Sequence, residues 1–469
     1  MSEPLSELSG VPLAVLQRFV DRIRDLTDSE TRGTRVLEQL AATWRARGLR
    51  PGEVVLLALP NGAELVAQVF GVLLARGVPA LVSPASPQGR QMALVDALPA
   101  RALVAMRRPA AQASRVERFE LGAAEVALFP DEQPPGAEAG EMVLLTSGTS
   151  GFASGCVFDL SALFRNARRH ADSVGLRAGD TVLVNLPLYF SYAMVAQVFG
   201  ALVCGADLVI SGPPFQPAAY VRTLSEHAVT VSALTPILVR ALLQRGEAFP
   251  EGLRSLGVGG DVLSPEHVAG LLRQRPRGEL YLTYGLSEAG PRVATLSAHV
   301  EPAHRFASAG LPLPGTQVSL VPRVPEGQKE LYVASDTVMK RRIGVVEGEK
   351  RHSLRAPGLL ATGDIFEQDD DGYLYFQGRL SDFLIKGGEK ICMASIRRLA
   401  TTLPGVLTAR TQIVAGEEGD DYDMVLTVAE ASGATDALAG EVSRLLRLAE
   451  RPRRVQVVAA DGATASLHK

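Results

Sequence analysis

Residues 142–157 read Met-Val-Leu-Leu-Thr-Ser-Gly-Thr-Ser-Gly-Phe-Ala-Ser-Gly-Cys-Val, an apolar run that breaks into a loop of small and hydroxylated residues. Glycine has no side chain to block a close approach, so the backbone N–H groups and hydroxyls of such a loop can surround phosphate oxygens. An ordinary turn is the alternative for an isolated cluster of this composition. We predict a phosphate-binding loop after a strand, formed by Thr146, Ser147, Gly148, Thr149, Ser150 and Gly151.

The length and composition indicate a large globular protein. A chain of 469 residues is typical of two or three domains. It has 46% hydrophobic and 21% charged residues, as a protein with a substantial core has, and its net charge of −3 gives no basic surface for nucleic acid. Cys156, Cys204 and Cys392 are too scattered for a disulfide framework or a zinc site. We therefore expect a reducing, cytoplasmic compartment, and we see no secretory signal.

Alternating strand and helix patterns predict an α/β fold. Residues 11–50 have a helical pattern. Residues 53–59 then read as a buried strand, 62–75 as an apolar helix and 79–82 as a second strand. This order is a β-α-β unit, the building block of a parallel sheet.

A seven-residue pattern occurs twice in the chain. Leu-Val-Ala-Gln-Val-Phe-Gly at 65–71 is matched by Met-Val-Ala-Gln-Val-Phe-Gly at 194–200, and each copy is followed by a glycine and a strand pattern. The period is too long for a solenoid, so we predict two similar α/β subdomains. Residues 186–206 carry no charge, but Pro187 and Gln197 favour a buried helix that leads into a strand rather than a membrane span.

Residues 331–378 change character, with short strand patterns and an Asp-Asp-Gly turn at 370–372. We interpret this region as a small β-rich subdomain that contains a hairpin, and the two aspartates as a solvated turn rather than a metal site.

The loop at 146–151 resembles the ATP loop of the adenylate-forming superfamily, which includes acyl- and aryl-CoA ligases, luciferases and peptide-synthetase adenylation domains. It matches neither Gly-x-x-x-x-Gly-Lys-Ser/Thr nor the dinucleotide pattern Gly-x-Gly-x-x-Gly. Later segments are similar to motifs of the same family in the same order. They are Ser-Leu-Gly-Val-Gly-Gly-Asp at 255–261, Tyr-Gly-Leu-Ser-Glu at 284–288, Ala-Thr-Gly-Asp at 361–364 and Gly-Arg at 378–379.

The resemblance implies roles for the residues of these motifs. Tyr284 would pack on adenine next to Gly285, Ser287 would meet the α-phosphate, and Glu288 would hold Mg²⁺, a hard cation that also binds phosphate oxygens. The expected small-molecule requirements are therefore ATP and Mg²⁺.

Two further motifs would complete the nucleotide site. Gly259, Gly260 and Asp261 would line the acyl and adenine pockets. The carboxylate of Asp364 can accept both ribose hydroxyls, and Arg379 would add a ribose or phosphate contact.

The chain departs from the family pattern at three places. Ala153-Ser154-Gly155 stands where the family has Pro-Lys-Gly, so the loop lysine is absent. Ser381 occupies the hinge position, which is commonly Asp or Lys. The last residues put His468 in place of the family's catalytic lysine; Lys469 would serve if the loop shifts, and a functionless tail is the alternative.

The substrate pocket is predicted from Phe190, Ser191 and Tyr192. Amino-acid-activating relatives have an aspartate at the position of Ser191, so an α-amino acid is disfavoured. Aryl-acid activators have a histidine at the position of Phe190. Phe190 and Tyr192 as simple core aromatics remain the alternative.

We therefore expect a large N-terminal domain, residues 1–378, with two similar α/β subdomains and a small β-rich subdomain, and a small mobile α+β domain, residues 379–469, after a hinge. The expected enzyme converts an aryl or acyl acid to acyl-AMP and pyrophosphate, then transfers the acyl group to CoA, a carrier protein or an amine. An ATP-dependent enzyme that activates a nucleophile other than a carboxylate and a non-catalytic nucleotide-binding protein are the alternatives.

Overall fold

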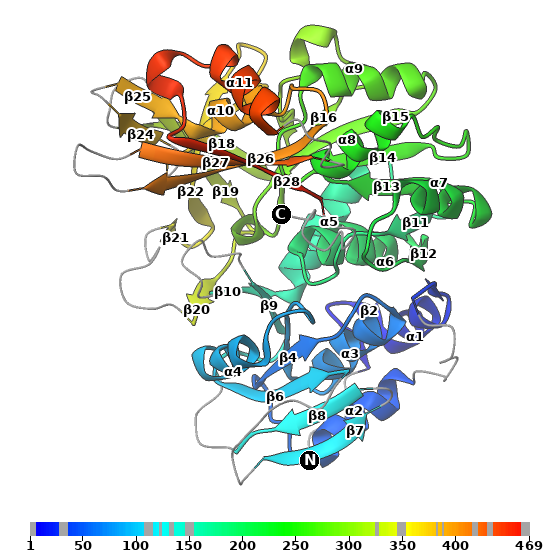
Figure 1. The fold of residues 1–469 in the computed structure, drawn as a ribbon. Coiled ribbons are helices and arrows are strands. Elements are labelled where there is room, and N and C mark those ends of the chain that lie inside the picture. Colours follow the sequence, from blue (N-terminus) through cyan, green and yellow to red (C-terminus); the bar gives the residue numbers. More distant parts are fainter. Residues whose placement is uncertain are drawn as a thin grey trace.

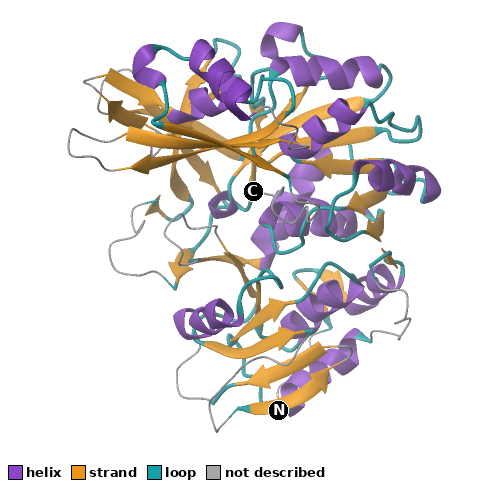
Figure 2. Cartoon of the chain, viewed as in Figure 1, coloured by secondary structure: helices purple, strands orange, loops and turns teal. Residues whose placement is uncertain are grey.

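The computed structural model describes residues 6–27, 36–106, 116–121, 124–130, 136–145, 154–323, 328–344, 353–380, 383–386, 389–414, 421–428 and 435–460. Figure 1 shows a first sheet in blue and cyan, a second in green, a third in yellow, and a C-terminal segment in orange and red. Strands alternate with helices along most of the chain (Figure 2), as expected for an α/β protein.

The first sheet has a parallel centre and antiparallel edges. β4 (Val54–Ala58) lies between β5 (Val78–Leu81) and β6 (Ala100–Ala105), and β9 (Glu141–Leu145) pairs in parallel with β5. Every residue of β4 is buried, and α3 (Ala63–Leu74) connects β4 to β5, which confirms the predicted β-α-β unit. The strand order is β20-β10-β9-β5-β4-β6-β8-β7. The other elements here are α2 (Leu37–Ala46), α4 (Gln88–Ala97), β7 (Glu117–Leu121), β8 (Ala124–Leu128), β10 (Gly155–Asp159) and β20 (Arg341–Ile343).

The second sheet has the order β17-β16-β15-β14-β13-β11-β12-β3, in which β15 to β3 run parallel. Its strands are β3 (Arg24–Asp25), β11 (Thr181–Val184), β12 (Asp207–Ile210), β13 (Val231–Leu234), β14 (Ser255–Gly259), β15 (Glu279–Gly285), β16 (Arg292–Ser297) and β17 (Leu311–Pro312). Helices α5 (Leu160–Ser173) and α6 (Gly200–Cys204) lie on the side of the first sheet, while α8 (Pro236–Arg245) and α9 (Pro265–Gln274) lie on the other side (Figure 1). α7 (Pro217–Glu226) packs beside α8.

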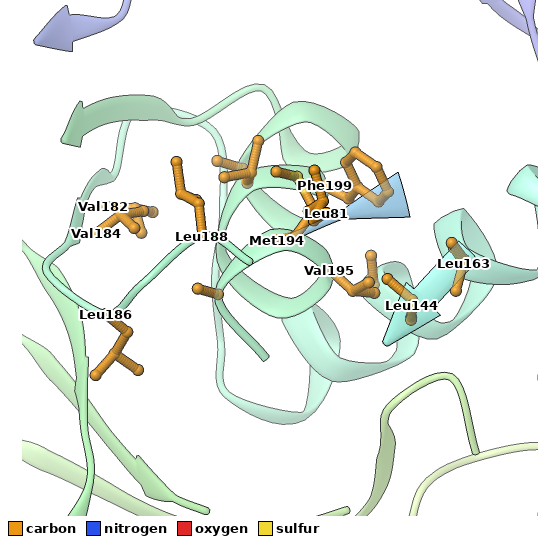
Figure 3. Close-up of a cluster of buried hydrophobic side chains, with 14 of the residues drawn as sticks. Leu81, Leu144, Leu163, Val182, Val184, Leu186, Leu188, Met194, Val195 and Phe199 are labelled. Atoms are coloured by element: carbon orange, nitrogen blue, oxygen red, sulfur yellow. The ribbon is translucent and has the colours of Figure 1, made fainter. Parts of the chain in front are cut away.

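The first copy of the seven-residue pattern lies in α3. The second lies in the π-helix η1 (Tyr192–Phe199) and ends at Gly200, the first residue of α6. Phe70 and Phe199 occupy the same position of the pattern, are both 0% exposed, and stack with ring centroids 6.3 Å apart. Figure 3 shows Leu81 and Leu144 of the first sheet in one cluster with Met194 and Phe199. Each fully buried side chain of this kind contributes roughly 1.5–3 kcal/mol. The two α/β subdomains therefore share one continuous core.

Residues 186–206 form η1 and α6 and lead into β12, as predicted. In the part of the chain that the structure describes, no helix is both long and apolar enough to cross a membrane.

The helical expectation for residues 11–50 was only partly correct. α1 (Leu13–Asp21) and α2 are helical, but β2 (Val11–Pro12), which pairs with β1 (Glu7–Leu8), and β3 interrupt the pattern. β3 adds to the edge of the second sheet by pairing in parallel with β12. A strand of two residues has no periodicity of its own, so only its partner strand could reveal it.

The third sheet is antiparallel and has the path β18-β19-β22-β21, with β23 paired to β22. The predicted hairpin is β22 (Leu359–Gln368) and β23 (Leu374–Arg379). At its turn the exposed Asp371 forms an ion pair with Arg305, as expected of a surface turn. The remaining elements are β18 (Thr316–Arg323), β19 (Gln328–Ser335), β21 (Leu354–Ala356) and the short helix η3 (Ala303–Arg305).

The residues after β23 form an α+β unit with its own core, in which Tyr422, Met424 and Ile396 are buried. Arg240 of α8 donates from Nε to the carbonyl oxygen of Leu407 at 2.7 Å, which joins this unit to the second sheet. The unit comprises β24 (Phe383–Lys386), β25 (Glu389–Cys392), α10 (Met393–Ala400), β26 (Val406–Val414), β27 (Asp421–Val428), α11 (Thr435–Leu445), η5 (Leu448–Glu450) and β28 (Arg454–Ala459).

Candidate active site

Tyr284, Asp364 and Arg379 come together from three strands. Tyr284, near the end of β15, donates its hydroxyl to Oδ2 of Asp364 at 2.7 Å. Asp364 stands opposite Arg379 in the β22–β23 pair, and Arg379 Nε lies 3.1 Å from Asp364 Oδ1. Asp364 is only 2% exposed, so the hydroxyl of Tyr284 and the charge of Arg379 offset the cost of burying its carboxylate. Burial and the adjacent Asp364 raise the pKa of Tyr284 well above its ordinary value, so its hydroxyl stays a donor at neutral pH.

The turn after β15 directs two side chains to different neighbours. This turn is η2 (Ser287–Ala289). Ser287 Oγ lies 2.9 Å from Oγ of Ser191, the residue before η1. Glu288 Oε1 lies 2.5 Å from Arg342 Nη2. A Cβ on Gly285 would lie 1.9 Å from the carbonyl oxygen of Pro291, so only glycine permits the turn at this point.

Arg342, which we did not predict, connects Glu288 to the flank of the predicted phosphate loop. It lies on β20, opposite Cys156 of β10, and donates from Nη1 to Ser154 Oγ at 2.9 Å. Its side chain is 7% exposed. The sequence signal was the basic run at 340–342, but Lys340 and Arg341 turn away and pair with Glu141 at 2.7 and 2.8 Å.

Several predicted residues lie outside the described part of the chain. These are Thr146, Ser147, Gly148, Thr149, Ser150, Gly151, Ser381 and Lys469. The flanks of the loop are described: Leu145 at the end of β9 pairs with Gly155 at the start of β10. The predicted loop therefore lies in the connection between two neighbouring strands, and Ser154, the first described residue after it, bonds to Arg342.

At the end of β14, Gly259 permits a close approach of Thr283 and of Tyr192, a residue of the predicted acid pocket. A Cβ on Gly259 would lie 2.4 Å from Oγ1 of Thr283 and 3.4 Å from Cε1 of Tyr192. Gly260 follows with a φ of 94°, in the left-handed region. Asp261 is exposed, and its Oδ1 accepts the backbone N–H of Val262 at 2.8 Å.

Tyr192 has polar neighbours that the sequence did not reveal. The guanidinium carbon of Arg292 lies 4.5 Å from the centre of the Tyr192 ring, and the ring of His170 packs edge-on at 6.2 Å. Burial and the charge of Arg292 lower the pKa of His170 to about 3, so this imidazole is neutral at physiological pH. Phe190 packs on the preceding tyrosine, with ring centroids 4.6 Å apart. Ser191 and Tyr192 therefore adjoin the other site residues.

The family model described as AMP-binding enzyme matches residues 34–341. An indoleacetate–CoA ligase of Aromatoleum aromaticum is 27% identical over 444 residues, which cover 87% of this chain and 83% of that ligase. A feruloyl-CoA synthase of Amycolatopsis is 28% identical over 393 residues, which cover 80% of this chain and 78% of that synthase.

Among solved structures, the o-succinylbenzoate CoA synthetase of Bacillus subtilis in complex with its acyl-adenylate intermediate has the same fold. The TM-score is 0.75 at 21% identity, and the match covers 95% of this chain and 94% of that one. The likeness extends over both the large N-terminal part and the small C-terminal part.

Proposed function

Because the chain belongs to the AMP-binding enzyme family, we propose that it is an ATP-dependent, adenylate-forming ligase acting on an aryl or acyl acid. The carboxylate of the acid attacks the α-phosphorus of ATP, pyrophosphate leaves, and an acyl-AMP forms. An acceptor then attacks the acyl carbon, and AMP leaves. In this mechanism the protein acts mainly by positioning the reactants and by stabilising charge.

The main support for this proposal is the set of contacts made by residues 284–288. Tyr284 bonds to the predicted ribose carboxylate Asp364, Ser287 bonds to Ser191 of the predicted acid pocket, and Glu288 pairs with Arg342 at the phosphate-loop flank. Residues 284–288 thus touch the predicted sites of the nucleoside, the acid and the phosphates. A reaction that joins a carboxylate to the α-phosphate of ATP needs these three sites in contact.

The nucleotide would be held by residues from both large sheets and the third sheet. Tyr284 and Gly285 would bind adenine, with Gly259, Gly260 and Asp261 alongside, while Asp364 and Arg379 would hold the ribose. Ser287 would donate to the α-phosphate. The predicted loop, Thr146 to Gly151, would bind the outer phosphates.

Mg²⁺ fits this site through one protein carboxylate. The described residues contain no group of three or more His, Cys, Asp or Glu side chains that could enclose a metal ion. A nucleotide-bound Mg²⁺ takes most of its ligands from phosphate and water, so Glu288 suffices as its protein ligand. The ion would neutralise phosphate charge. Glu288 must exchange its ion pair with Arg342 for this role, which leaves the guanidinium available to phosphate oxygens.

Phe190, Ser191 and Tyr192 would form the acid pocket, and CoA would be the acceptor, since the relatives above are CoA ligases. A carrier protein and an amine are the alternative acceptors. We also propose that residues 379–469 move about Ser381 between the two steps, with Lys469 near the reacting groups during the first. In support, β23 ends at Arg379 and the unit that follows has its own core.

The test is Mg-ATP-dependent pyrophosphate release across aryl, acyl and amino acids, with mass detection of the adenylate. Release with aryl or acyl acids, lost in Glu288→Ala, is the expected result. ATP binding without release for any acid would favour a non-catalytic protein. Release that requires a nucleophile other than a carboxylate would favour the second enzymatic alternative. Addition of CoA, a carrier protein or an amine then identifies the acceptor.

A further inference from the structure

Apart from Arg342, whose guanidinium pairs with Glu288, three arginines are buried among the described residues, and one of them differs from the others. Arg240 donates from Nε to the carbonyl oxygen of Leu407 at 2.7 Å, and Arg275 donates from Nη2 to that of Leu253 at 2.9 Å. Arg292 is the most buried of the three, at 3% exposed. Its Nε and Nη2 have no hydrogen-bond partner within the described ranges.

The backbone of Arg292 is nevertheless firmly held. Its N–H donates to Oδ1 of Asn166, and its carbonyl oxygen accepts from Nδ2 of the same side chain, both at 2.9 Å. Asn166 belongs to α5, so this pair of bonds anchors the start of β16. The guanidinium is therefore presented at a defined position, over the ring of Tyr192.

An unpaired buried cation destabilises a fold, and a contact with one aromatic ring offsets only part of that cost. Burial lowers the pKa of Arg292, as expected for a charge without a counterion. His170, the other polar group on Tyr192, is neutral and its Nδ1 also has no partner among the described residues. Arg292 therefore brings one positive charge to the ring of Tyr192, and the neutral His170 beside the same ring does not balance it.

The two unpaired nitrogens define the chemistry of the missing partner. Nε and Nη2 form one edge of the guanidinium, and their N–H bonds point in the same direction. A carboxylate accepts two parallel hydrogen bonds from such an edge. Tyr192 follows Ser191, whose hydroxyl bonds to Ser287. Through Tyr192, the guanidinium of Arg292 is thus linked to the predicted acid pocket, so an acid with its reacting carboxylate near Ser287 would extend past Tyr192 to reach Arg292.

We propose that the Nε–Nη2 edge of Arg292 binds a second carboxylate of the substrate, so that the enzyme activates dicarboxylic acids at one end. The inference rests on the proposed function and specifies the acid.

The test compares matched acids that differ by one carboxylate: hexanoate with adipate, and benzoate with terephthalate. The readout is the ratio of kcat/KM for the dianion over the neutral-tailed acid in pyrophosphate release. We expect the wild type to prefer the dianions and Arg292→Met to lower this ratio roughly 10–100-fold, as loss of a buried bidentate ion pair does. Arg292→Lys should restore part of it. Arg275→Met is the matched control: it also removes a buried guanidinium, and the ratio should stay unchanged.

A thermal melt separates recognition from a structural role. Arg292→Met should melt no lower than the wild type without ligand, because the variant loses an unpaired charge. Arg275→Met should melt lower, because it loses hydrogen bonds to backbone carbonyls. A lower melting temperature of Arg292→Met with an unchanged ratio would overturn the proposal.

The outcomes also distinguish this inference from the proposed function. Adenylation of neutral-tailed acids without preference for dianions overturns the dicarboxylate inference and leaves the ligase standing. If no acid is adenylated, the anion site is tested by binding. Equilibrium binding of labelled adipate and terephthalate is then measured in the presence of a non-hydrolysable ATP analogue. Binding that Arg292→Met abolishes supports the anion site, and equal or absent binding overturns it.

Discussion

Arg342 and Glu288 form a 2.5 Å ion pair between β20 and the turn after β15. The second Nη of Arg342 donates to Ser154, at the end of a loop in which the family lysine is missing. The side chains of Arg342 and Glu288 are 7% and 16% exposed, so solvent screens their charges weakly. Arg342 therefore places a positive charge next to the site where ATP phosphates are proposed to bind.

We expect Arg342→Gln to lower kcat/KM for Mg-ATP in pyrophosphate exchange by roughly 10–100-fold, because a charge-assisted hydrogen bond is worth roughly 1.5–3 kcal/mol. Arg341→Gln is the control, since its guanidinium pairs with Glu141 on the other side of the same strand. The control should lose stability and keep kcat/KM. Faster exchange in Arg342→Gln would instead mean that the guanidinium merely competes for Glu288.

Asp364 and Tyr284 can be separated by two conservative changes. Asp364→Asn should weaken ATP binding roughly tenfold, because ribose hydroxyls lose a charged acceptor. Tyr284→Phe keeps the ring but removes a donor from a buried carboxylate, so the free energy of unfolding should fall by about 1–3 kcal/mol. Calorimetric titration with ATP and urea unfolding measure the two effects. Unchanged ATP affinity in Asp364→Asn would contradict the ribose assignment.

Glu141 should make the stability depend on pH in the acid range. Burial alone would raise its pKa, but hydrogen bonds from Arg341 and Lys340 outweigh burial and lower the pKa to about 2. The folded pKa lies below the ordinary value of 4.5, so the stabilisation is complete above that value and is lost as pH falls towards 2.

Glu141→Gln should therefore lower the free energy of unfolding by about 2 kcal/mol at pH 7. This figure is discounted for solvent screening, because the side chains of Lys340 and Arg341 are each 36% exposed. The loss should shrink as pH falls. Urea unfolding of both proteins between pH 7 and pH 3 measures this difference. A constant difference across that range would show that the Glu141 carboxylate is not the titrating group.

Phe70 and Phe199 should be energetically coupled. Each Phe→Leu change should cost about 1–2 kcal/mol in unfolding free energy, and the double variant should depart from additivity by about 0.5–1.5 kcal/mol, because the rings stack across the two subdomains. A double-mutant cycle by urea unfolding tests this. Strict additivity would mean that the two helices do not share a core.

Local pattern predicted much of the fold. The strand, helix and strand between residues 53 and 82 carry continuous apolar runs bounded by glycine and proline, and they appear as β4, α3 and β5. The repeated seven-residue pattern predicted two α/β subdomains, and the structure has two eight-stranded sheets with helices. It did not predict that the repeats themselves pack together, because a pattern records burial but not the partner that buries it.

The sequence by itself determined the family, the α/β class and the order of the motifs, because these depend on neighbouring residues. Tertiary structure decided the contacts between residues far apart in the chain. Tyr284 meets Asp364 across 80 positions, and Arg342 meets Glu288 across 54. Arg292 lies only five residues after Ser287, which the sequence placed in the site. That its buried Nε and Nη2 have no partner among the described residues is visible only in the folded chain. The energy of a charge depends on its surroundings, and those surroundings exist only in the folded chain.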